Sequence, residues 1–121
     1  MKSLIIVAHG SKKEISNDEV KDIVNQIKSN DTDYTITEPA FLEFATPSIE
    51  QSVKNSINLE CFEIYIYPYF LNSGKHVTSD IPNTIKKLSL KYPQASFTIL
   101  PHFGQSIKIN QIILSDTNVT H

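Results

Sequence analysis

Short apolar runs alternate with amphipathic segments along the whole chain. The first run, residues 4–8, is rich in Ile and Val and predicts a strand that is buried on both faces of a sheet. Further strands are predicted at residues 34–42, 62–67 and 95–100. Pro39 cannot donate a ladder hydrogen bond and therefore favours an edge position for the second strand.

An amphipathic segment follows each predicted strand, so that four helices are expected. Ser16 and Glu19 have the spacing of a capping box, and Thr46-Pro47 has the form of an N-cap followed by proline at the first helical position. The third helix is expected to begin near residues 79–82, after a loop that carries His76. The predicted apolar faces consist of Val20, Ile23, Val24 and Ile27, then Ile49, Val53 and Ile57, then Ile81, Ile85 and Leu88, and finally Ile109, Ile112 and Ile113.

The order β-α-β-α-β-α-β-α predicts one α/β domain over residues 1–114, a flavodoxin-like sandwich. It would hold a four-stranded parallel sheet with helices on both faces and right-handed crossovers. A chain of 121 residues suffices for one such domain. Residues 115–121 are polar and predict a frayed C-terminal tail.

Composition narrows the classes of function. A formal net charge of −2 provides no general attraction to nucleic acid, and all eleven basic residues are lysine, which removes the bidentate guanidinium fork. Cys61 is the only cysteine and is expected to be an inert, buried residue in a reducing compartment. The N-terminal apolar run is too short for a signal peptide or a transmembrane helix, so we expect a cytoplasmic protein without a membrane partner.

The carboxyl ends of parallel strands share one edge of the sheet, which is where ligands bind in open α/β folds. That edge is expected to receive His9, Glu43, His76 and His102. We interpret His9 and His76 as a functional pair, because equivalent strand ends place them together. Glu43 is either a third member or a solvated loop carboxylate. His102 follows a proline and can equally serve only to shape its turn, and His121 is assigned no role.

Other residues near this edge indicate the kind of ligand. Lys12, Lys13 and Lys75 flank the two histidines and would favour an anionic substrate, although loop lysines are usually only solvated. The Gly10-Ser11 pair could offer backbone N–H groups to an anion, and Tyr69 and Phe70 could pack on a flat ligand. Neither GxxxxGK[ST] nor GxGxxG is present, so no organic cofactor is expected.

Two imidazoles and a carboxylate form a borderline nitrogen and oxygen ligand set. Such a set suits divalent iron, cobalt, nickel or zinc better than magnesium or calcium. Because no thiolate is expected at the edge, a tetrathiolate structural zinc site is excluded.

Four segments resemble the class II chelatases, in particular the small CbiX-type enzymes. The segments are V-A-H-G-S at 7–11, F-L-E at 41–43, T-P-S-I at 46–49, and P-Y-F-L-N-S-G-K-H-V with D-I-P at 68–82. The resemblance covers residues 3 to about 114. Members of this family are lyases that insert a divalent metal into sirohydrochlorin or a related tetrapyrrole for cobalamin or siroheme biosynthesis.

The resemblance implies roles for particular residues. His9 and His76 would bind the incoming Co²⁺, Fe²⁺ or Ni²⁺, and Glu43 would act as a ligand or proton acceptor. The short form of the family works as a homodimer with the tetrapyrrole between its subunits. Two residues depart from the family pattern: Lys12 stands where many relatives have arginine, and His102 stands where an apolar residue is expected. The residues expected to contact the tetrapyrrole are Ser11, Lys12, Lys75 and Tyr69.

The chemistry of metal insertion fits these residues. Insertion exchanges two pyrrole protons for one divalent metal, so it needs a weak, open metal site and a base that is active near neutrality. Imidazole, with an ordinary pKa of about 6.5, can serve in both roles. Two alternatives remain open: a non-catalytic metal or tetrapyrrole carrier that uses the same residues, and phosphoryl transfer through His9, which the absence of arginine disfavours. The residues do not choose among cobalt, iron and nickel.

Overall fold

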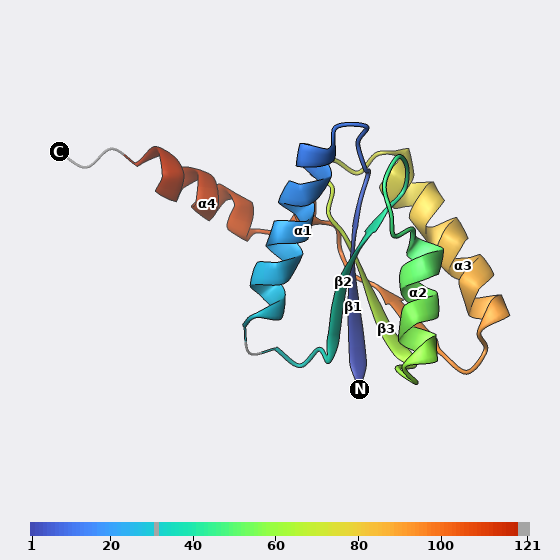
Figure 1. Cartoon of the computed structure of the whole chain (residues 1–121). Coiled ribbons are helices and arrows are strands. Elements are labelled where there is room, and N and C mark those ends of the chain that lie inside the picture. Colours follow the sequence, from blue (N-terminus) through green and yellow to red (C-terminus); the bar gives the residue numbers. More distant parts are fainter. Residues whose placement is uncertain (31, 119–121) are drawn as a thin grey trace.

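The four predicted strands form one parallel sheet with the strand order β2-β1-β3-β4 (Figure 1). The structure is a computed structural model that describes residues 1–30 and 32–118; His121 lies outside the described residues. Pro39 lies in the edge strand β2, as its missing N–H group predicts. The strands are β1 (Lys2–Ala8), β2 (Ile36–Phe41), β3 (Glu63–Pro68) and β4 (Ser96–Ile99).

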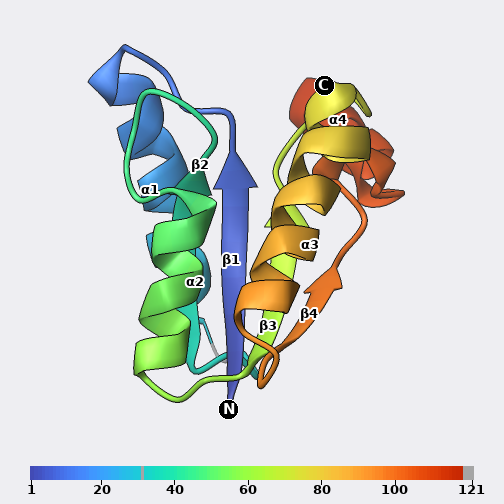
Figure 2. The same ribbon diagram turned by 90° about the vertical axis from the view of Figure 1, so that its right-hand side faces the viewer.

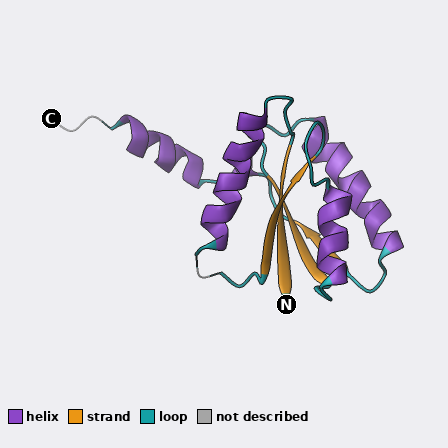
Figure 3. Cartoon of the chain, in the orientation of Figure 1, coloured by secondary structure: helices purple, strands orange, loops and turns teal. Residues whose placement is uncertain are grey.

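Three of the four α-helices cover the sheet. Figures 1 and 2 show α1 (Glu14–Lys28) on one face and both α2 (Ile49–Asn58) and α3 (Ile81–Lys91) on the other. The fourth helix, α4 (Lys108–Thr117), projects away from the sheet on the side of α1 (Figure 3). The predicted α/β class with helices on both faces is therefore confirmed, with the two faces unequally covered.

The larger part of the core lies between the sheet and the pair α2 and α3. Strand residues alternate between faces, so that Ile64 and Ile66 point to this side while Tyr65 and Tyr67 point to the other. Cys61 is fully buried, as predicted. The buried members of this cluster are Ile5, Val7, Ala40, Ile49, Val53, Ile64, Ile66, Ile81, Ile85 and Leu88.

The face under α1 has a much smaller core. Its buried members are Leu4, Ile6 and Val24. The other apolar residues predicted for the helix face, including Ile23 and Ile27, stay partly exposed. The apolar stripe of α1 is thus positioned as predicted but only partly covered.

The first helix begins earlier than its predicted capping box. Ser16 lies inside α1, and the N-cap residue Lys13 makes no side-chain cap hydrogen bond. The reason is a turn held by Ser11 and Asn17: the Asn17 amide accepts from the Ser11 N–H at 2.9 Å and donates to the Ser11 carbonyl at 2.8 Å. The Ser11 hydroxyl also accepts from the Lys13 N–H at 3.0 Å, so this turn replaces the predicted cap.

The second helix begins later than predicted. Its N-cap is Ser48 and not Thr46, and Ser48 forms a reciprocal capping box with Gln51. Pro47 lies before the helix, where its carbonyl accepts a hydrogen bond from the Phe41 N–H at 2.8 Å. Thr46-Pro47 therefore belongs to the loop that follows β2, and the predicted boundary was wrong by two residues.

The other two helices also differ from their predicted bounds. A π-helical turn, η1 (His76–Asp80), precedes α3, so His76 lies in the first helical turn and not in the loop. The last helix continues to Thr117, three residues into the segment predicted as a tail, and residues 119–121 lie outside the described part. No helix of the described chain has the length and apolar character needed to cross a membrane.

Candidate functional site

His9 and Glu43 are brought side by side because the pairing of β1 with β2 continues past the ends of both strands. The Leu42 N–H donates to the Ala8 carbonyl at 3.1 Å, and the Glu43 N–H donates to the His9 carbonyl at 2.9 Å. Gly10 adopts a φ of +92°, and a Cβ atom there would lie 1.8 Å from the Glu43 carbonyl oxygen. Only glycine permits this close approach of the two loops.

His76 reaches the same edge from the third strand. The Tyr69 N–H donates to the Val7 carbonyl at 2.7 Å, which ties the start of the loop after β3 to β1. The loop then leads into η1, and the ring centroids of His76 and His9 lie 4.9 Å apart. The structure thus brings together His9, Glu43 and His76, which follow three different strands in the sequence.

The same ring nitrogen, Nδ1, contacts a hydrogen-bond acceptor in both histidines. His9 Nδ1 lies 2.9 Å from the Gly10 carbonyl oxygen, and His76 Nδ1 lies 2.8 Å from Asp80 Oδ2. A carbonyl and a carboxylate accept hydrogen bonds, so Nδ1 is the protonated nitrogen in each ring. When the rings are neutral, each Nε2 therefore carries a free lone pair that can take a proton or a metal ion.

Glu43 completes a place for a positive charge. Its Oε2 atom lies 3.3 Å from His9 Nε2, and the two side chains are 53% and 45% exposed. An imidazole lone pair and a carboxylate at this distance repel each other unless a proton or a cation lies between them. The pair is therefore suited to bind a proton, or to bind a metal ion that keeps water molecules as its other ligands.

The site is open and not a finished metal cage. Within residues 1–30 and 32–118, no three His, Cys, Asp or Glu side chains are close enough to hold a metal ion together. The predicted ligand set of His9, His76 and Glu43 is therefore present as neighbours and not as a preassembled three-ligand centre. An incoming metal would need these side chains to adjust or would take further ligands from water or substrate.

Aromatic side chains line the site: Phe70 was predicted to lie near it, whereas Phe44 was not. Phe44 follows Glu43 with a φ of +63°, is 58% exposed, and its ring centroid lies 6.4 Å from that of His9. The Lys12 ammonium group lies 5.2 Å from the centroid of the same ring. The ring centroid of Phe70 lies 5.9 Å from that of His76. The flat, exposed ring of Phe44 beside His9 provides a surface on which a planar ligand can pack.

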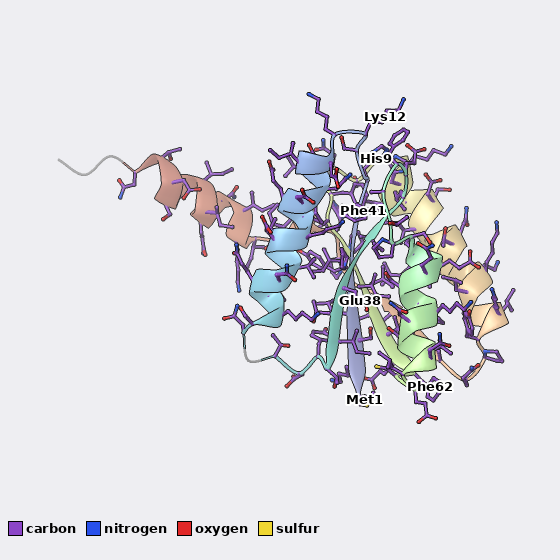
Figure 4. All side chains as sticks on the ribbon, viewed as in Figure 1. Met1, His9, Lys12, Glu38, Phe41 and Phe62 are labelled. Carbon is purple, nitrogen blue, oxygen red and sulfur yellow. The ribbon has the colours of Figure 1, made fainter. Side chains whose placement is uncertain are left out.

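Lysines surround the histidines as predicted. Figure 4 shows His9 and Lys12 at the end of the molecule opposite Met1 and Phe62. Lys12, Lys13 and Lys75 are exposed there. Ser11 and Lys12 also line a polar pocket of about 270 Å³ beside Phe44.

Two candidate residues lie elsewhere. The Tyr69 ring packs against Phe103 with 5.3 Å between centroids, on the side of the sheet that α1 covers. Its neighbour Phe70 is the ring that contacts His76, because successive residues point in opposite directions. His102 is buried, and its carbonyl accepts a hydrogen bond from the Gln105 N–H at 2.9 Å, so it shapes the turn after β4.

Asp80 is a partner of His76 that the sequence could have revealed. Residues four apart lie on one face of a helix, so the spacing of His76 and Asp80 indicates an oriented imidazole once both are assigned to a helix. The prediction placed His76 in a loop, and the relation was missed. Phe44 carried no such signal, because its positive φ depends on the loop that packs around it.

The fold and the site together define a class: a parallel α/β domain with an open imidazole and carboxylate site at the carboxyl edge of its sheet. The CbiX family model matches residues 3–118 of this chain. The chain belongs to the CbiX family.

Curated relatives extend the match. The chain is 32% identical over its full 121 residues to a sirohydrochlorin ferrochelatase of Priestia megaterium, of which it spans 45%. It is 33% identical over 85 residues to a sirohydrochlorin cobaltochelatase of Methanococcus maripaludis; these residues are 70% of this chain and 58% of that protein. The chain thus spans about half the length of these relatives.

Solved structures share the fold at lower sequence identity. A CbiX protein of Marinobacter aquaeolei superposes with a TM-score of 0.83 at 20% identity, covering 96% of this chain and 93% of that one. SirB from Bacillus subtilis with Fe³⁺ gives a TM-score of 0.86 at 21% identity, covering 98% of this chain and 48% of that one. This domain therefore has the size of the Marinobacter chain and of about half of the SirB chain.

Proposed function

We propose that this domain is a sirohydrochlorin chelatase that inserts a divalent metal into the tetrapyrrole for siroheme or cobalamin biosynthesis. The two curated relatives are a ferrochelatase and a cobaltochelatase, which makes Fe²⁺ and Co²⁺ the first candidates for the metal substrate, with Ni²⁺ as a third. One observation carries the proposal: the ring centroids of two imidazoles lie 4.9 Å apart at the sheet edge, and a carboxylate lies 3.3 Å from Nε2 of one of them.

The chemistry follows from that arrangement. Free macrocycle and M²⁺ give metallated macrocycle and two protons, so the site must release a metal and accept protons. His9 and His76 hold the ion weakly through Nε2, and weak binding lets it move on to the macrocycle. The Glu43 carboxylate and His9 Nε2, whose lone pair becomes available as the ion leaves it, take up the two pyrrole protons in turn and pass each to water, which the exposure of both groups permits.

The substrate is a flat macrocycle that carries many carboxylates. Lys12, Lys13 and Lys75 attract those carboxylates, and the exposed ring of Phe44 packs against the macrocycle. Ser11 donates to a carboxylate from the polar pocket. In agreement with the short form of the family, the functional unit is a homodimer with the tetrapyrrole between its subunits. The cytoplasmic location expected from the sequence stays a prediction.

An anaerobic absorbance assay of Co²⁺ and Fe²⁺ insertion into sirohydrochlorin tests the proposal. His9→Ala and His76→Ala should each lower the insertion rate by at least about 100-fold, since each removes a metal ligand or a base. Glu43→Gln should lower it too, whereas Glu19→Gln, an exposed carboxylate on α1, is the matched control and should keep the wild-type rate. Wild-type rates in both histidine variants would refute the assignment.

The number of tetrapyrrole molecules that each domain converts distinguishes an enzyme from a carrier. An enzyme converts many equivalents of tetrapyrrole per domain, whereas a carrier gives a spectral change that stops at one equivalent. We expect multiple turnover, with the metal dependence of the rate identifying the preferred ion. A change that saturates at one equivalent would favour a metal or tetrapyrrole carrier built on the same histidines.

A further inference from the structure

Lys21 is a half-buried lysine to which the proposed mechanism assigns no role. It lies in α1, four residues after Asn17 and so on the same helix face, which is turned toward the loop after β1. Its ammonium nitrogen lies 6.0 Å from the centroid of the Phe41 ring. Among the residues that the structure describes, it forms no ion pair with a carboxylate. Because burial deprives a charge of hydration, an ammonium group placed in this way favours an anionic ligand.

Lys12 reaches the same place from the turn before α1. Its ammonium nitrogen lies 5.2 Å from the centroid of the exposed Phe44 ring, and it too forms no ion pair within the described part of the chain. Figure 4 shows Phe41 in the same half of the molecule as His9 and Lys12. The face of an aromatic ring attracts an ammonium group and leaves N–H donors over for other acceptors. Both lysines are thus positioned by rings and can still bind an anion.

The two lysines line one polar pocket, to which Ser11 and Thr46 contribute hydroxyl groups. Its volume of about 270 Å³ is below the roughly 300–1,000 Å³ of sites that enclose a whole drug-sized ligand. The pocket can therefore take a side chain of a macrocycle but not the macrocycle itself. Its lining contains two ammonium groups and one carboxylate, that of Glu14, and so has a net positive charge.

Phe44 connects this pocket to the histidine site. Its ring lines the pocket, and the ring centroid lies 6.4 Å from that of His9. A tetrapyrrole takes its metal at the centre of the macrocycle and carries its carboxylates at the rim. A macrocycle centred at the histidines would therefore extend its rim past Phe44, which brings one peripheral carboxylate to the pocket.

We propose that this pocket binds one peripheral carboxylate of the tetrapyrrole, and that Lys21 is the residue that makes it selective for a carboxylate at that position. Lys12 and Lys21 donate to the carboxylate oxygens, and the Glu14 carboxylate on the same lining disfavours a second anion. The contact fixes which edge of the macrocycle lies over His9. The inference rests on the proposed function for the identity of its ligand, and it adds a specificity-determining residue on α1.

Fluorescence titration with metal-free sirohydrochlorin measures this contact apart from metal insertion. Lys21→Met keeps an alkyl stem over Phe41 and removes the charge. The dissociation constant and the KM for sirohydrochlorin should both rise about 10-fold, the usual cost of one charge-assisted hydrogen bond. The kcat of Co²⁺ insertion should stay unchanged, because the contact is equally strong before and during the reaction. Lys21→Arg should restore most of the affinity.

Two further variants fix the sign of the charge effect. Glu14→Gln should lower the dissociation constant about 2-fold, since it removes a negative charge that repels the ligand. Lys28→Met makes the same change in net charge as Lys21→Met at the exposed far end of α1, and it is the matched control that should bind as the wild type does. Circular dichroism checks that each variant is folded. A Lys21→Met variant that binds sirohydrochlorin as tightly as Lys28→Met would overturn the proposal.

Fully methyl-esterified sirohydrochlorin separates recognition of charge from packing. It has no free carboxylate, so the wild type and Lys21→Met should bind it equally well. An equal loss of affinity for the ester and the acid would mean that Lys21 only supports the shape of the pocket, and would also overturn the proposal. A wild type that binds sirohydrochlorin through Lys21 but inserts no metal would refute the proposed function and leave the carboxylate site standing.

Discussion

The Asp80 carboxylate is the contact that orients His76. It lies 2.8 Å from Nδ1 within the π-helical turn η1, and it fixes which ring nitrogen faces the site. Carboxylates that hold a metal-binding histidine in this way raise the basicity of the ring and define its direction. We therefore expect Asp80 to act as a positioning residue through His76.

Removing this carboxylate tests its role. Asp80→Ala should lower both cobalt affinity and the insertion rate by about 10–100-fold, the usual cost of losing such a partner. Asp80→Asn should be intermediate, because the amide oxygen still accepts from Nδ1 but without the charge. The measurements are cobalt titration and single-turnover insertion, with Asp18→Ala on the exposed side of α1 as control. A wild-type cobalt affinity in Asp80→Ala would contradict the role.

At the residue scale, the sequence predicts those site members that depend on strand ends. His9, Glu43 and His76 come together because parallel strands share an edge, and alternation of apolar runs is enough to place them there. Asp80 and Phe44 were not predicted, because one depends on where a helix begins and the other on a positive φ. Tyr69 was assigned to the site, but its ring lies under the α1 layer, and Phe70 contacts His76 instead.

At the element scale, the start of α2 separates the predicted cap from the observed one. Ser48→Ala removes a hydroxyl that accepts from the Gln51 N–H at 3.1 Å and should lower the free energy of unfolding by about 1 kcal/mol. That loss corresponds to a fall in Tm of about 4 °C for a domain of this size. Thermal unfolding followed by circular dichroism at fixed protein concentration measures it.

Ser16→Ala is the matched control for the cap. The sequence motif predicts Ser16 as the N-cap, whereas the structure places it inside α1. Inside a helix, alanine is more favourable than serine by roughly a few tenths of a kcal/mol. We therefore expect Tm to stay the same or to rise slightly. The reverse order, with Ser16→Ala costly and Ser48→Ala neutral, would mean that the predicted boundaries are right.

The apolar stripes were easier to predict than the helix boundaries. Val24, Val53 and Ile85 are buried at the positions that helical spacing predicts. Boundaries depend on competing local contacts, such as the Ser11–Asn17 turn before α1, which periodicity does not reveal. The stripe of α4 was also identified from its spacing, but in the structure this helix projects away from the sheet and none of its residues is buried.

At the scale of the whole molecule, the core and the site are separate parts. The buried cluster between the sheet and the helices α2 and α3 consists of aliphatic side chains, and it needs no ion to hold it together. The histidines and Glu43 lie outside it, at an exposed edge. We therefore expect a metal to bind this molecule as a substrate and not as part of its folded framework.

Thermal unfolding with and without metal tests that separation. Treatment with EDTA should leave Tm unchanged, because no described group of three ligands holds a structural ion. Added Co²⁺ should raise Tm in proportion to the logarithm of its concentration, since an ion that binds only the folded state at 100 times its dissociation constant stabilises by about 2.7 kcal/mol. The double variant His9→Ala, His76→Ala should unfold at the EDTA-treated temperature whether or not cobalt is present. A large fall in Tm on EDTA treatment of the wild type would instead make the metal a structural part of the fold, and a site that holds its ion so firmly would be unsuited to passing it to a macrocycle.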